Sequence, residues 1–137
     1  MKHLHVTCAI IENNGFVLAA QRSASMSMPF KWEFPGGKID PGETARACLE
    51  RELLEELGIF IAIVNECVPS TYDYPQFRIT LYPFICSLKS GTIVLHEHAK
   101  VQWLRPDDLN GLDWAEADVP VLQSYLEGLK SQFRPRK

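Results

Sequence analysis

Three glutamates stand close together in the stretch from Gly37 to Ile59, which reads GKIDPGETARACLERELLEELGI. Glu52, Glu55 and Glu56 lie on one arc of a predicted helix, because residues three and four positions apart share a helix face. Their carboxylates repel one another, and the predicted helix stop at Gly58 places two of them in the last turn, where the helix dipole disfavours anions. This arrangement costs stability unless a cation is present.

A neighbouring arc of the same predicted helix carries a stripe of leucines. Leu49, Leu53 and Leu57 recur every four residues and indicate a face buried against a core, while the carboxylates face outward or into a cleft. Carboxylate oxygens suit Mg²⁺ or Mn²⁺, and proteins typically hold Mg²⁺ with a few carboxylates, water and substrate phosphates. The pattern therefore predicts a divalent metal and a phosphate substrate, although an acidic run alone is also typical of a solvated helix face.

Residues around the glutamates extend the pattern with fixed spacing. It consists of Gly37, Glu43 after five residues and, after seven more, Arg51-Glu52-Leu53, Glu55-Glu56 and Gly58-Ile59. This pattern resembles the complete signature of the Nudix hydrolase family. The preceding residues 33–38, EFPGGK, are similar to the matching segment of the MutT-type subgroup, whose members hydrolyse nucleoside triphosphates.

The resemblance implies roles for the signature residues. Hydrolysis of a phosphoanhydride requires that charge on the phosphoryl oxygens be neutralised and that a water be placed in line with the scissile bond, and bound metal ions do both. Carried to this sequence, the family pattern makes Glu55 and Glu56 the main metal ligands. Glu52 is a further ligand or base, and the Gly36 carbonyl is a backbone ligand. Mg²⁺ is the implied cofactor, with Mn²⁺ as a substitute.

A further catalytic glutamate in MutT-type enzymes lies on a later loop. Glu97, six residues before Trp103, is the candidate here, as a metal ligand or general base. His96 and His98 flank it, so a separate HxH metal pair and an ordinary polar loop are alternative interpretations.

Other signature positions are interpreted as structural. A glutamate before the helix and an arginine on it can pair and fix the loop, which favours that role for Glu43 and Arg51. Gly37 and Gly58 are expected to have backbone roles, in the turn before the helix and at the helix stop. Lys38, beside the glycines, is either a phosphate contact or an ordinary surface lysine.

Asp118 occupies the position at which MutT-type enzymes place a base-reading residue, commonly an amide. An ionised carboxylate only accepts hydrogen bonds and suits the N4 amino group of cytosine, whereas a protonated one can also meet an oxidised purine. Asp118 also stands where an N-cap of the last helix is expected, and both roles can coexist.

Arg22 and Phe34 resemble residues that line the base pocket in the subgroup, against the alternatives of a surface arginine and a core phenylalanine. Three aromatic residues are candidates to stack on a base, with core packing favoured for at least two of them: Tyr72, Tyr74 and Trp114. The stretch around Trp114 and residues 96–98 looks like the CTP pyrophosphohydrolase-like branch of the MutT group. That likeness favours pyrimidine nucleotides over 8-oxo-dGTP.

The predicted function is metal-dependent conversion of a nucleoside triphosphate, (d)NTP, into the monophosphate, (d)NMP, and pyrophosphate. The expected role is clearance of modified nucleotides of the cytosine class or 8-oxo-dGTP. One alternative is another Nudix substrate, such as a nucleotide sugar, a dinucleoside polyphosphate or capped RNA. The other is a non-catalytic nucleotide sensor.

The remaining pattern indicates strands and two principal helices. We expect strands at 4–11, 16–20, 59–72, 77–88 and 101–104, a loop at 22–31, a helix capped by Thr44, a helical turn at 106–111 and a helix at 119–129. Such an order is typical of an α/β layered domain. The Nudix resemblance implies an α/β/α sandwich with a mixed β-sheet.

Composition sets broad limits. With 137 residues, of which 46% are hydrophobic, the chain is expected to form a single domain, 1–137, with a flexible tail over about 131–137. A net charge of -3 argues against stable nucleic-acid binding. The apolar runs indicate neither a signal peptide nor a membrane span, so we expect a cytoplasmic monomer or homodimer. The cysteines lack CxxC spacing and are expected to be reduced and buried: Cys8, Cys48, Cys67 and Cys86.

Overall fold

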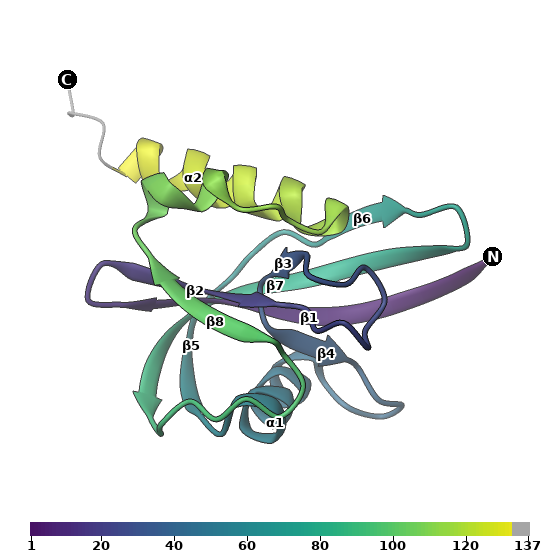
Figure 1. Ribbon diagram of the computed structural model, residues 1–137, viewed down its shortest axis with the longest axis horizontal. Helices are drawn as coiled ribbons and strands as arrows, with labels where there is room; N and C mark the ends of the chain where they lie inside the picture. The colour runs from purple at the N-terminus through teal and green to yellow at the C-terminus, as the bar shows by residue number, and fades with distance from the viewer. Residues whose placement is uncertain (133–137) are drawn as a thin grey trace.

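One mixed sheet forms the middle layer of the protein (Figure 1). The computed structural model describes residues 1–132. The strands are β1 (Lys2–Asn13), β2 (Phe16–Gln21), β3 (Trp32–Glu33), β4 (Gly36–Lys38), β5 (Phe60–Glu66), β6 (Ser70–Asp73), β7 (Phe77–Ser90) and β8 (Lys100–Leu104). Their order is β3-β2-β1-β7-β5, with β4 beside β1, β6 beside β7 and β8 beside β2. The two long central strands, β1 and β7, run parallel, and the other strand pairs are antiparallel.

Helices cover both faces of this sheet. Helix α1 (Ala45–Leu57) lies on one face and α2 (Val119–Gln132) on the other, as Figure 1 shows. Two short 3₁₀ helices, η1 (Pro106–Gly111) and η2 (Glu116–Asp118), lead into α2. The predicted α/β/α sandwich with a mixed sheet is therefore confirmed.

Alternation along β1 divides the hydrophobic core into two layers, because successive side chains of a strand point to opposite faces. Ala9 and Ile11 pack with the leucine stripe of α1, whereas Cys8 and Ile10 pack with residues of α2. The leucine stripe is fully buried, as its spacing predicted: Leu49, Leu53 and Leu57. The neighbouring arc of α1, which carries Glu52, Glu55 and Glu56, is thereby left outside this core layer.

Most expected strand and loop positions are confirmed. The hairpin between β1 and β2 turns at Asn14 and Gly15, both with positive φ, of 53° and 84°, as a two-residue type I′ turn requires. The expected single strand over 59–72 is wrong. It divides into β5 and β6, which pair with different parts of the long β7, and Pro69 lies in the break, where it has no N–H to donate.

The structure also bears on the expectations for the C-terminal helix, the cysteines and membrane-spanning segments. The last helix continues to Gln132, past the expected end at 129, and the rest of the expected tail lies outside the described residues. The four cysteines are free, as expected, but Cys67 is only partly buried. Among the described residues, no helix has both the length and the apolar character needed to cross a membrane.

Candidate active site

Helix α1 has the predicted cap at each end. The Thr44 hydroxyl accepts a hydrogen bond from the Ala47 N–H at 3.1 Å, which caps the first turn. Gly58 adopts a φ of 69° and donates its N–H to the Leu54 carbonyl at 3.0 Å. These two caps fix the rotation and the end of the helix, and so the direction of its glutamates.

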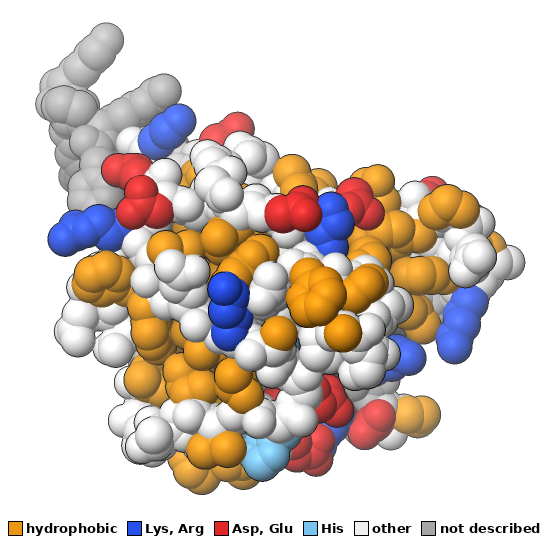
Figure 2. All heavy atoms as spheres, viewed as in Figure 1, with side chains coloured by type: hydrophobic (Ala, Val, Ile, Leu, Met, Phe, Trp, Pro, Cys, Tyr) orange, Lys and Arg blue, Asp and Glu red, His pale blue; other side chains and the backbone are white. Residues whose placement is uncertain are grey.

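A cavity of about 590 Å³ lies beside this end of α1. Every residue predicted to bind metal or substrate lines it: Arg22, Phe34, Gly36, Lys38, Glu52, Glu55, Glu56, Glu97 and Asp118. Gly37 also lines it, whereas the other residues predicted to be structural, Glu43, Arg51 and Gly58, do not. Acidic side chains gather on the surface beside α1 (Figure 2). The tertiary structure thus brings these residues from five separate segments of the chain to one place.

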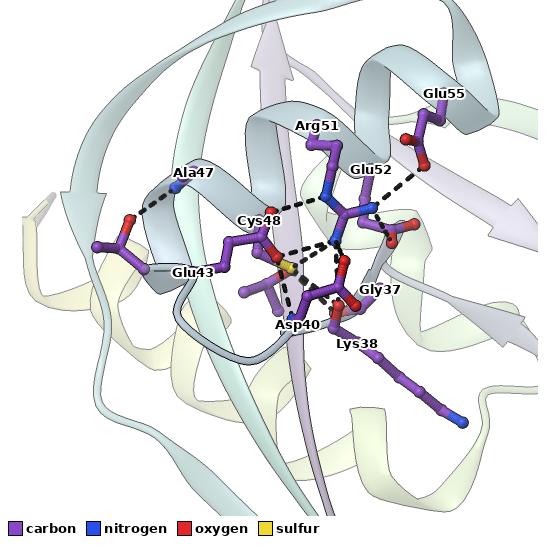
Figure 3. A network of polar contacts seen from close by, with 11 residues as sticks. Gly37, Lys38, Asp40, Glu43, Ala47, Cys48, Arg51, Glu52 and Glu55 are labelled. Carbon is purple, nitrogen blue, oxygen red and sulfur yellow. Dashed lines mark hydrogen bonds and ion pairs between the residues drawn. The ribbon is translucent and has the colours of Figure 1, made fainter.

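Arg51 is the centre of a polar network on α1, drawn in Figure 3. Its Nε donates to Glu43 Oε2 at 2.7 Å, so the expected pair is present. Its Nη1 also donates to Glu52 Oε1 at 2.8 Å and to Glu55 Oε2 at 3.2 Å. The hydrogen bonds from Arg51 lower the pKa of Glu43 to about 2, and the carboxylates in turn raise the pKa of Arg51. One guanidinium therefore holds the loop before the helix and two of the signature glutamates.

The two glycines before the helix allow very close packing. A Cβ on Gly36 would stand 1.9 Å from the Thr7 carbonyl oxygen. A Cβ on Gly37 would stand 2.2 Å from Cδ of Glu52. Neither glycine has a positive φ, so the requirement here is space and not backbone conformation.

Glu56 is the signature residue with the least favourable surroundings. Burial, followed by the nearby Glu52 and Glu97 carboxylates, raises the pKa of Glu56 to about 9. Its Oε2 atom is buried and has no hydrogen-bond partner within residues 1–132. A divalent cation would relieve both the repulsion and the missing partner, and hard oxygen donors suit such an ion.

The glutamate carboxylates of the cavity do not converge on one point. Within residues 1–132 no three His, Cys, Asp or Glu side chains have the arrangement of a formed metal site. In this arrangement Arg51 Nη1 donates a hydrogen bond to both Glu52 and Glu55. The donor set nevertheless fits a divalent ion, since the glutamates line one cavity and have oxygen ligands only.

The raised pKa of Glu56 predicts how the metal-free protein responds to pH. The folded state binds this proton more tightly than the unfolded chain, whose glutamate value is 4.5. The contribution to stability is therefore fully present below pH about 4.5 and is lost as the pH rises through about 9. Urea unfolding with chelator should show the free energy of unfolding falling across that range. Glu56→Gln should flatten this dependence, and equal slopes for the two proteins would contradict the assignment.

Asp118 lines the same cavity and belongs to η2. Its side chain is buried, and Oδ2 accepts a hydrogen bond from the Phe34 N–H at 2.9 Å. Burial and then the nearby Glu33 carboxylate raise the pKa of Asp118 well above its ordinary value. Within residues 1–132, its side-chain hydrogen bond goes to the loop before β4 and not to the first turn of α2, so the N-cap alternative is not supported.

Arg22 and Phe34 differ from the simple alternatives. Arg22 is not an ordinary surface arginine, because its Nη1 pairs with Glu33 Oε1 at 2.6 Å and its side chain is only 16% exposed. Phe34 is 2% exposed and packs on Trp114 with ring centroids 4.7 Å apart, yet it also borders the cavity. It is both a core residue and part of the cavity wall.

The three candidate stacking residues differ in burial and position. Trp114 is 6% exposed and donates its indole N–H to the Leu109 carbonyl at 2.7 Å. Tyr72 packs edge-on against Tyr74, which lines the cavity. Tyr72 is half-buried but does not line the cavity, so Tyr74 is the one of the three that is placed to contact a ligand there.

Two polar residues of the site were not predicted. Glu33 lines the cavity, and the buried His98 meets its Oε2 through Nε2 at 2.8 Å. Because His98 turns to Glu33 while His96 lines the cavity, the two histidines do not form the alternative HxH metal pair. The position of Glu33 on a short strand directly before the glycines is the signal that could have identified it.

Comparison with known proteins agrees with this geometry. The model of the NUDIX domain matches residues 1–125. The CTP pyrophosphohydrolase of Escherichia coli (strain K12) is 40% identical over 127 residues, covering 92% of this chain and 93% of that protein. The 8-oxo-dGTP diphosphatase of the same organism is 34% identical over 123 residues, covering 89% and 95%.

Solved structures show the same relationship. The solution structure of the E. coli ORF135 protein matches with a TM-score of 0.81 and 33% identity, covering 99% of this chain and 96% of that one. The MutT protein from Methanosarcina mazei Go1 matches in fold, with a TM-score of 0.83, 20% identity and 97% of each chain covered. The fold and these matches define a nucleotide hydrolase. The chain belongs to the Nudix family.

Proposed function

We propose that this protein is a MutT-like pyrophosphohydrolase that cleaves a nucleoside triphosphate into the monophosphate and pyrophosphate. The observation that carries the proposal is that one cavity of about 590 Å³ is lined by a cluster of glutamates, a buried aspartate and aromatic side chains. A triphosphate has the matching division into a charged end that needs cations and a flat base that needs an enclosed recess.

The proposed cofactor is Mg²⁺, with Mn²⁺ as a substitute. Glu55 and Glu56 would be its main ligands, joined by Glu52, Glu97 and the Gly36 carbonyl, all of which line the cavity. When bound, the metal neutralises phosphoryl charge and lowers the pKa of water. The orphaned Oε2 of Glu56 is the strongest support for this ligand set.

The other side chains near the proposed metal ligands would bind the phosphates, position the glutamates or accept a proton. Lys38 lines the cavity beside the glycines and would contact a phosphate as a mobile cation. Arg51 stands behind the cavity wall and holds Glu52 and Glu55 in place. Glu97 would act as a further ligand or as the base that takes the proton of the attacking water.

For the base, we propose the cytosine class, with 8-oxo-dGTP as the second candidate. The raised pKa of Asp118 favours its neutral form, which presents one O–H donor and one carbonyl acceptor, much as an amide does. This pair complements the N3 acceptor and N4 amino donor of cytosine. It can also meet an oxidised purine. The 40% identity to a protein named CTP pyrophosphohydrolase supports the first choice.

The test is a hydrolysis screen with Mg²⁺ over ordinary and oxidised nucleoside triphosphates, nucleotide sugars, dinucleoside polyphosphates and capped RNA, with both products identified. We expect monophosphate and pyrophosphate from triphosphates, and highest kcat/KM for cytosine derivatives. Release of orthophosphate, preference for a nucleotide sugar, or no turnover on any substrate would each overturn the proposal. We further propose a cytoplasmic monomer or homodimer that acts on small nucleotides.

A further inference from the structure

His98 lies directly behind the wall of the cavity and does not line it. Its side chain is 1% exposed, and its Nε2 lies 2.8 Å from Glu33 Oε2. Its sequence neighbours His96 and Glu97 do line the cavity, as does Glu33. Any effect of His98 on a bound nucleotide must therefore pass through these neighbours.

Glu33 also forms a hydrogen bond to Arg22, in a second segment of the chain. Its Oε1 accepts from Arg22 Nη1 at 2.6 Å, and Arg22 Nε in turn donates to the Ser27 carbonyl at 2.6 Å. The loop held in this way contains Met28 and Phe30 with φ of 49° and 64°, which side-chain-bearing residues rarely adopt. The two oxygens of Glu33 thus tie the loop at 22–31 to the loop that carries Glu97.

Glu97 stands between two anchors of its own loop. Before it, the His96 N–H donates to the carbonyl of Glu56 at 3.4 Å. After it, the His98 side chain is held on Glu33, and the Ala99 N–H donates to the Gln21 carbonyl at 2.9 Å. His98 is thus the side chain next to Glu97 that ties this loop to Glu33, in addition to the backbone hydrogen bonds of His96 and Ala99.

The chemistry of His98 argues against simple core filling. Because the Glu33 oxygen is an acceptor, Nε2 must carry the hydrogen, and Nδ1 is buried without a partner within residues 1–132. A buried polar atom without a partner costs stability that an apolar side chain of similar size would not lose. The imidazole is therefore placed for its hydrogen bond to Glu33 and not for its volume.

We propose that His98 is a positioning residue which, through Glu33, sets the place of Glu97 at the metal end of the cavity and of Arg22 at the base end. This inference rests on the proposed function for its kinetic consequence, but the positioning itself is a property of the loops.

The kinetic test compares two replacements of this histidine. His98→Phe keeps a buried ring and removes the donor, whereas His98→Gln keeps an N–H donor close to the position of Nε2. On the preferred triphosphate with Mg²⁺, we expect His98→Phe to lower kcat by about tenfold or more, because misplacing a catalytic group by a fraction of an ångström has effects of this order. His98→Gln should stay within about threefold of the wild type.

A double replacement separates positioning from general damage. In a Glu97→Gln background, His98→Phe should lower kcat by less than about twofold, because residues that act through one another are not additive. Equal fold losses in both backgrounds would overturn the proposal. His3→Phe is the control for replacing a histidine by phenylalanine, because His3 on β1 is exposed and does not line the cavity.

Hydrogen exchange gives a readout that needs no activity. The amides of residues 96–99 should exchange faster in His98→Phe and at the wild-type rate in His98→Gln and His3→Phe. Unchanged exchange in His98→Phe would overturn the positioning even if no substrate were ever found, whereas failure of the wild type to turn over triphosphates would overturn only the proposed function. If His98→Phe does not fold, His98→Asn, which is too short to reach Glu33, replaces it in both measurements.

Discussion

Glu56→Gln is expected to lower turnover of the preferred triphosphate by about a thousandfold at saturating Mg²⁺, because an ion that supplies several kcal/mol of charge stabilisation loses a ligand. Glutamine is close in shape, but its neutral side chain cannot supply the charge of a carboxylate. Glu56 is the residue for which this matters most, since its buried Oε2 has no other partner among the described residues. Initial rates of pyrophosphate release against Mg²⁺ concentration measure the effect.

Two controls decide whether this loss is specific. Glu50→Gln changes an exposed glutamate on the same helix that does not line the cavity, and it should leave kcat within about twofold of the wild type. The metal-free Glu56→Gln protein should also unfold at the same or a higher temperature, because burial and the nearby Glu52 and Glu97 carboxylates no longer act on an ionisable group. Near-normal Mg²⁺-dependent turnover in Glu56→Gln would remove this residue from the ligand set.

Gly37→Ala is expected to lower kcat by about a hundredfold or more, an effect typical of a small displacement at a catalytic site. The added Cβ would stand 2.2 Å from Cδ of Glu52, so either that carboxylate or strand β4 must move. Glu52 is also held by Arg51, and its movement would disturb the hydrogen bonds that position Glu55. Steady-state kinetics with thermal unfolding of the same samples checks the prediction.

Gly128→Ala in α2 is the matched control, because a Cβ there meets nothing within 4 Å. It removes the entropic disadvantage of a helical glycine and should raise stability by about 0.5–1 kcal/mol while activity stays unchanged. If Gly37→Ala kept wild-type kcat, the close packing of this glycine against Glu52 would have no bearing on turnover.

Arg51 illustrates how much local sequence information the site contains. Its carboxylate partners Asp40, Glu43, Glu52 and Glu55 all lie within eleven residues, and the pair with Glu43 was predictable from spacing along one loop and one helix. The caps at Thr44 and Gly58 were predictable for the same reason, since each depends on atoms within a few residues.

Glu33 and His98 illustrate what such reasoning misses. They are separated by 65 positions, and their contact depends on β8 pairing with β2, which in turn pairs with β3. The division of 59–72 into β5 and β6 was missed for a related reason, because both segments are β-prone and only pairing with β7 separates them. The strand propensity of a segment does not specify which strand it pairs with.

The amino-acid sequence by itself determined the glutamate-bearing helix, its caps, the glycines before it and the family to which these belong. All of these depend on neighbours along the chain, whose geometry follows from helix periodicity and turn chemistry. Only the tertiary structure decided which distant side chains complete the cavity, the raised pKa of Glu56 and Asp118, and the contact of His98 with Glu33. Burial and through-space charge depend on sheet order and register, which local patterns do not specify.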